Sequence, residues 1–314
     1  MTLPRRHLIL AAALALTGVV VWLVSEQATR TSGAAPEPQA SSKRASSSVP
    51  VADPAVSRDG GAAPEREKPK GEAASSALPS QIEALLAQPQ HQRPQMREVP
   101  AFDALVEEEL IRRYRAIPSL GDKQHLLRIL AYRGGEKSVD LLVKAMTVEC
   151  RGRKLSYAED TVMIFLPQLM GVLAREHDSA RRFLEEARNP SFWTARRKWE
   201  SDRGWYVDQV LAGSALRGLA LTGTPAVHEL LASYRSRSDD VARDLVGAIV
   251  TAAWMYRRVI EHGLEKTMDD ILYRAGDLTD ISAWAETDEG REWEKWAEGL
   301  RRRRGPDSQS NGTP

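Results

Sequence analysis

The side chains that could carry acid–base or metal chemistry are few and scattered in this sequence. The chain has six histidines and one cysteine, Cys150. No two histidines are four residues apart and no His-Glu-x-x-His sequence occurs, so the spacing that holds zinc on one helix face is missing. The sequence also lacks a Gly-x-Ser-x-Gly elbow, a glycine-rich phosphate loop and a Cys-x-x-Cys pair. We therefore predict a non-catalytic protein with no cofactor and no metal.

Binding chemistry has a clearer signal, in a stretch that combines tryptophan with arginine. Both residue types are enriched at the energetic centres of protein interfaces. We therefore predict a partner-binding site formed by Trp193, Arg196, Arg197, Trp199, Arg203 and Trp205. The alternative is that the tryptophans fill a seam between two helical repeats while the basic side chains extend around them into solvent.

The overall charge bears on what kind of partner is expected. The formal net charge is +1, from 44 basic and 43 acidic residues. Dedicated nucleic-acid binders normally carry a basic surplus, so we expect a protein partner and no nucleic acid. A single cysteine excludes an intramolecular disulfide. Cys150 is predicted to be a small, partly buried residue at a helix end, with a reactive thiol as the alternative.

The elements that must position these residues repeat along the chain. Leu127–Ala131, Met170–Ala174 and Leu216–Ala220 share an apolar spacing and start 43 and 46 residues apart (127 to 170, 170 to 216). After each comes a second segment with apolar residues at i, i+3, i+4 and i+7, which is one face of an α-helix. The pattern predicts two helices per unit. We expect nearly all helix from Ala101 to Leu300, and no sheet.

A weaker fourth unit follows the three clear ones. It combines a long helix over 241–260 with a second apolar face at Met268, Ile271, Leu272 and Ala275. A last helix, from Gly290 to Leu300, places Trp293, Trp296 and Leu300 on one side and charged residues elsewhere. That is the pattern expected of a terminal helix that closes a repeat array, since one of its faces must meet water.

A period of about 40 to 47 residues with two helices per unit is that of HEAT-type repeats. These features resemble the HEAT/armadillo class of α-solenoids over roughly Ala101 to Ala275, most closely where Ala215–Ala220 leads into Gly223-Thr224-Pro225. The resemblance implies an all-α fold in which antiparallel helix pairs stack as a short HEAT-like α-solenoid. It carries over no functional residue, because the shared motif is structural.

The N-terminus has the pattern of a membrane-targeting segment. Arg5 and Arg6 precede an uncharged run from Leu8 to Val24, which is 17 residues long and at the short limit for a spanning helix. We predict a cytoplasmic basic tip over 1–7 and a transmembrane signal anchor over 8–24, with a cleaved signal peptide as the alternative. In both cases the basic tip stays inside, so the remainder is extracytoplasmic, or periplasmic in a Gram-negative bacterium.

Composition separates the rest of the chain into three parts. Residues 25–80 are rich in Ala, Ser, Pro and Gly and poor in large apolar residues, which predicts a disordered linker. Residues 81–304 form the predicted repeat domain, and 305–314 a disordered tail. The leading hypothesis is a membrane-tethered extracytoplasmic scaffold or adaptor that binds a protein. The alternatives are an enzyme or small-ligand-binding protein with a dispersed site in a concave groove, and a structural envelope or assembly factor.

Overall fold

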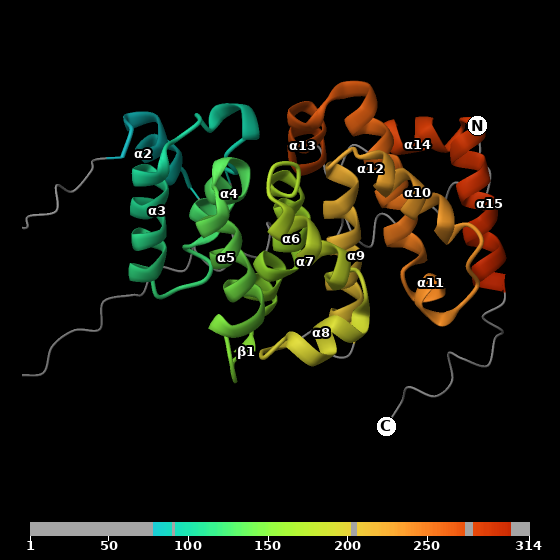
Figure 1. Cartoon of the computed structure of the whole chain (residues 1–314), viewed down its shortest axis with the longest axis horizontal. Coiled ribbons are helices and arrows are strands. Elements are labelled where there is room, and N and C mark those ends of the chain that lie inside the picture. The colour runs from blue at the N-terminus through green and yellow to red at the C-terminus, as the bar shows by residue number, and fades with distance from the viewer. Residues whose placement is uncertain (1–77, 90–91, 202–205, 274–278, 303–314) are drawn as a thin grey trace, which may run out of the picture.

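The computed structural model describes residues 78–89, 92–201, 206–273 and 279–302 (Figure 1). The predicted tip, anchor and tail, and the linker up to residue 77, lie outside these residues. Within the described part of the chain, no helix combines the length and the apolar character needed to cross a membrane. Leu78 is buried, and the first helix of the described residues starts at Ser80.

Helices form almost all the regular structure of the described residues, which confirms the predicted all-α class. The N-terminal elements are α2 Ser80–Leu86, η1 Met96–Glu98, α3 Ala104–Ala116, α4 Gln124–Arg133, α5 Glu136–Lys144, the π-helical η2 Ala145–Glu149, α6 Tyr157–Leu173 and α7 Asp178–Ala187. The C-terminal elements are α8 Pro190–Arg196, α9 Val207–Leu221, α10 Pro225–Tyr234, α11 Asp240–Asp244, α12 Val246–His262, α13 Leu264–Tyr273, α14 Thr279–Ala285 and α15 Asp288–Arg302.

One short parallel pairing corrects the prediction of no sheet. Strand β1, Lys154–Leu155, pairs with β2, Glu200–Ser201. The Ser201 hydroxyl donates to Asp160 of α6, which fixes β2 against the core. Two residues per strand are too few to leave an alternating pattern in a sequence, so nothing local could have predicted this pairing.

The helices that carry the repeated pattern lie next to one another. In chain order, α4 packs against α6, α6 against α9, and α9 against α12 (Figure 1). The second helix of each predicted unit packs beside this row. Helix α5 contacts α4 and α6, α7 contacts α6 and α9, and α10 contacts α9 and α12. The repeated apolar residues face the core, since Leu127, Met170 and Leu216 are at most 1% exposed.

The Gly-Thr-Pro sequence between α9 and α10 ends one helix and starts the next. Gly223 has a φ of 65°, a left-handed conformation that only glycine adopts at little cost. Thr224 takes the N-cap position of α10 and Pro225 its first turn, where the missing N–H of proline has no helical partner to lose.

The fourth unit departs from the predicted pattern. The expected single helix over 241–260 is two helices, α11 and α12, and the Asp239 side chain caps the first through the Ala242 N–H at 2.9 Å. Helix α13 then packs against α12 and against η1, which lies near the start of the fold. In Figure 1, α13 lies on the side of α12 that faces the N-terminal helices. Its Asp269 accepts the Met96 N–H at 3.0 Å. The last helix, α15, packs on α12 and α11 instead.

Candidate functional site

The two described tryptophans of the predicted binding stretch are buried. Trp193 is 0% and Trp199 2% exposed. The Trp193 indole Nε1 donates to the Ala187 carbonyl oxygen at 2.6 Å, and Trp199 Nε1 donates to the Met146 carbonyl oxygen at 2.7 Å. Each ring therefore has its one polar atom paired inside the protein, as a buried indole requires. We call these two buried rings, with the side chains that hold them, the frame. They offer no surface to a partner.

Local sequence explains how helix α8 brings Trp193 inward. The Asn189 side chain accepts the Ser191 N–H at 3.1 Å and Pro190 takes the first position, so the helix starts at a defined residue. Phe192 and Trp193 then pack edge-on with Phe183 of α7, at centroid distances of 5.5 and 6.0 Å. The aromatic cluster holds α8 against α7.

Arg197 fixes the end of α8 to the start of α9. Its Nε donates to Asp208 Oδ1 at 2.7 Å, and its guanidinium lies 5.1 Å from the centre of the Trp199 ring. The other oxygen of Asp208 accepts the Thr194 hydroxyl at 2.9 Å. Asp208 and Arg197 are both mostly buried, so this ion pair belongs to the frame.

A second segment, absent from the predicted site, joins this stretch. The loop after η2 runs beside residues 197–201: the Gly152 N–H donates to the Lys198 carbonyl at 2.8 Å and the Glu200 N–H to the Arg153 carbonyl at 2.9 Å. Gly152 has a φ of 71°, which suits glycine in this turn. We call the exposed cations of the two segments the basic lobe: Arg151, Arg153, Lys154, Arg196 and Lys198.

Two arginines of the basic lobe have no carboxylate partner among the described residues. Arg153 pairs with Glu159 at 2.7 Å, and Lys198 Nζ donates to the Ala195 carbonyl at 2.9 Å. Arg196 lies 5.7 Å from the centre of the Phe192 ring and forms no ion pair in the described part, and neither does Arg151. Exposed guanidinium groups on a fixed backbone suit carboxylates, which they can bind through two parallel hydrogen bonds.

The predicted site residues thus divide into three groups. Trp193 and Trp199 are buried, and Arg197 is mostly buried and paired. Arg196 is exposed and belongs to the basic lobe. Arg203 and Trp205 lie outside the described residues. Sequence reasoning missed Arg151, Arg153 and Lys154, although the run Arg151-Gly152-Arg153-Lys154 is a visible basic turn.

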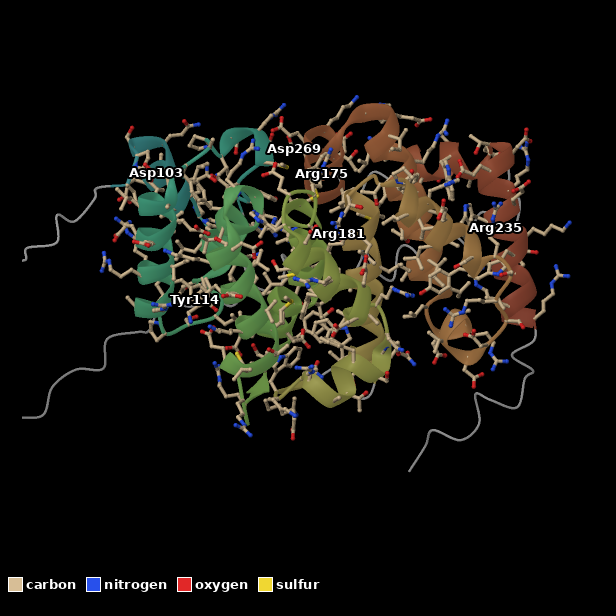
Figure 2. The ribbon with its side chains drawn as sticks, viewed as in Figure 1. Asp103, Tyr114, Arg175, Arg181, Arg235 and Asp269 are labelled. Atoms are coloured by element: carbon tan, nitrogen blue, oxygen red, sulfur yellow. The ribbon has the colours of Figure 1, made fainter. Side chains whose placement is uncertain are left out.

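One compact polar cluster near Cys150 could be mistaken for a catalytic centre. The Tyr114 hydroxyl donates to Glu149 Oε2 at 2.5 Å, and Lys123 pairs with the other oxygen of Glu149 while lying 4.1 Å from the centre of the Tyr114 ring. Figure 2 shows Tyr114 near the lower end of α3. Burial raises the pKa of the Tyr114 hydroxyl and of the Cys150 thiol. Both groups are held protonated, and Cys150, which was predicted to be partly buried, is fully buried.

Two further observations complete the description of the site. Among the described residues, no group of three or more His, Cys, Asp or Glu side chains is placed to hold a metal ion. Comparison of the chain with family models, with characterised proteins and with solved structures finds no significant match.

Proposed function

We propose that this protein is a membrane-tethered extracytoplasmic scaffold, built from HEAT-like helix-pair repeats, that binds a protein partner through the basic lobe. The anchor over 8–24 and the linker over 25–80 are the proposed tether. The repeat architecture is supported by the row α4, α6, α9 and α12 with second helices along its flanks. Repeat arrays of this kind offer extended surfaces that commonly serve in binding.

The observation that carries the proposal is the position of Arg151 and Arg196. Both are exposed without a carboxylate partner in the described chain, while the backbone beneath them is fixed by buried Trp199 and by the β1–β2 pairing. A rigid surface loses little entropy on binding, and a cluster of one charge steers a partner of the opposite charge. The partner expected here is a protein segment rich in Asp and Glu.

Site-specific crosslinking tests this proposal in the full-length chain. A photo-crosslinking amino acid at exposed Ala195, next to Arg196, should yield one discrete protein adduct in the native membrane. The double variant Arg151→Glu/Arg196→Glu should remove that adduct because it reverses both unpaired charges. The matched control, Arg175→Glu/Arg182→Glu, makes the same charge change on exposed residues and should keep it. Figure 2 places Arg175 at the opposite end of the molecule from β1 and α8 of Figure 1.

The crosslinking outcomes distinguish whether the basic lobe binds a protein, binds lipid or binds neither. An adduct that persists in the double variant would show that the lobe does not bind the partner. Crosslinks to lipid alone would make the lobe a contact for anionic headgroups instead.

The tether has its own measurement. Carbonate washing should leave the full-length chain in the membrane fraction, and an intact mass corresponding to a start near Thr29 would replace the anchor with a cleaved signal peptide.

A further inference from the structure

Another arginine without a carboxylate partner among the described residues lies in the row of central helices, on α9. The Arg217 Nε donates to Gln168 Oε1 of α6 at 3.0 Å. Gln168 is 3% exposed, and its backbone N–H donates to the Ser214 hydroxyl of α9 at 3.2 Å. Arg217 lies nine residues beyond Asp208 along α9, which is about 13 Å of helix, so it is separate from the frame of the basic lobe.

The polar atoms that remain around Arg217 are all donors. Its Nη1 and Nη2 atoms and the Gln168 Nε2 atom have no hydrogen-bond partner among the described residues, and none is a fully enclosed unpaired atom. The Gln168 oxygen is already used by Arg217. The two terminal nitrogen atoms of Arg217 therefore remain free to donate side by side, which is the arrangement that binds a carboxylate.

No carboxylate of the described chain balances the charge of Arg217. No Asp or Glu oxygen of these residues lies within 4.0 Å of its guanidinium. Burial lowers the pKa of Arg217 to about 10, and the group is still protonated at neutral pH. Another buried arginine, Arg258 of α12, does have a carboxylate partner, because it pairs with Asp270 at 2.5 Å. Arg217 is thus a half-buried cation with only a neutral amide beside it.

Gly213 allows close packing of α12 on α9 beside Arg217. Gly213 lies one turn earlier on α9, and a Cβ there would lie 3.8 Å from Arg217 Nη1 and 2.7 Å from the Ala248 Cβ of α12. The absent side chain lets Ala248 of α12 approach α9 beside Arg217.

We propose that Arg217, held in place by Gln168, binds a carboxylate group between α6, α9 and α12. The carboxylate accepts from Nη1 and Nη2 of Arg217 in an end-on fork, because Nε already donates to Gln168. The carboxylate comes either from a small organic acid or from an Asp or Glu side chain of a protein. This proposal does not depend on the basic lobe.

The thermal unfolding midpoint of the full-length chain tests the site. A ligand that binds the folded state raises the midpoint in a saturable way. Sodium acetate should do so when it replaces chloride at constant ionic strength if a small acid is the ligand. A triglutamate peptide should do so, without an effect of acetate, if a protein side chain is the ligand. A saturable response to either probe supports the proposal, and the probe that gives it identifies the source.

Variants make the response specific to Arg217. Arg217→Lys keeps the charge but loses the fork, so it should abolish the response. Gln168→Met keeps the side-chain length but loses the acceptor that holds the Arg217 guanidinium in place, and it should raise the half-saturating concentration by about tenfold. Arg175→Lys, at an exposed position, is the matched control and should respond as the wild type does.

A purely structural role for Arg217 predicts a different result. Arg217→Lys would then lower the midpoint in chloride, while the response to acetate or peptide would match that of the wild type. That result, or the lack of a saturable response to both probes in the wild type, overturns the proposal. If Arg217→Lys fails to fold, the half-saturating concentration measured for Gln168→Met decides between a binding role and a purely structural role.

Discussion

Gly171 of α6 and Gly218 of α9 face each other where the two helices cross. A Cβ on Gly171 would lie 2.1 Å from the Gly218 carbonyl oxygen, and a Cβ on Gly218 would lie 2.4 Å from the Pro167 carbonyl oxygen. Both neighbours are backbone atoms, which cannot rotate away as a side chain can. The crossing therefore requires glycine on both helices, and the Arg217–Gln168 hydrogen bond spans the same pair of helices.

Adding a methyl group at this crossing should destabilise the fold. Gly171→Ala and Gly218→Ala should each lower the free energy of unfolding by about 1–3 kcal/mol or more, because the helices must separate. Gly247→Ala is the control: the site is in α12, a Cβ there meets nothing within 4 Å, and alanine favours helix by up to about 1 kcal/mol. Urea denaturation followed by circular dichroism measures all three. Equal effects at the three positions would contradict the close crossing.

The carboxylate of Glu107 should stabilise helix α5 from outside that helix. Glu107 is 7% exposed and accepts the Gly135 N–H at 2.7 Å and the Ser138 N–H at 2.9 Å. Glu107→Ala leaves these donors at the start of α5 unpaired, so it should lower the free energy of unfolding by about 1–3 kcal/mol. Its neighbour Glu108 pairs with Lys137, and both side chains are more than half exposed. Glu108→Ala should cost less than about 1 kcal/mol in the same assay.

Acid should weaken the fold partly through Glu109. Hydrogen bonds from Arg112 and Arg113 lower the pKa of Glu109 to about 2 from an ordinary value of 4.5. Because the pKa is depressed in the folded state, the stabilisation is complete above the ordinary value and is lost as the pH falls toward 2. Glu109→Gln should therefore lose less stability than the wild type between about pH 5 and about pH 2.

Glu185, exposed on α7, provides the control for this pH experiment. Glu185→Gln should follow the wild-type dependence of unfolding free energy on pH. If Glu109→Gln also follows it, the two hydrogen-bonded arginines do not stabilise the charged form of Glu109.

Local periodicity explains what the sequence could predict. The i, i+3, i+4, i+7 spacing identifies residues that must face a core, and Leu127, Met170 and Leu216 are buried accordingly. Glycine with a positive φ followed by a proline at a helix start is equally local, so the turn at Gly223 and Pro225 was predictable. These signals require no knowledge of distant contacts.

Contacts between distant segments explain which features the sequence could not predict. Trp199 is buried because its indole reaches the Met146 carbonyl, 53 residues earlier, and no composition rule separates such a ring from an exposed one. The same holds for Arg217 and Gln168, which are 49 residues apart. Helix α13 has the apolar face of a repeat helix, yet it packs against η1, and its own sequence does not indicate which surface it covers.

Substitutions at Trp199, in the buried frame, and at Arg196, in the exposed basic lobe, should have opposite effects on stability and on crosslinking. Trp199→Phe removes the donor to the Met146 carbonyl and leaves a small cavity, so it should lower the free energy of unfolding by about 1–3 kcal/mol. Arg196→Ala changes an exposed residue without an ion pair and should shift it by no more than about 0.5 kcal/mol. The crosslink from position 195 should behave in the reverse way: Arg196→Ala weakens it, while folded Trp199→Phe retains it. A neutral Trp199→Phe combined with a lost crosslink would instead place the indole on the partner surface.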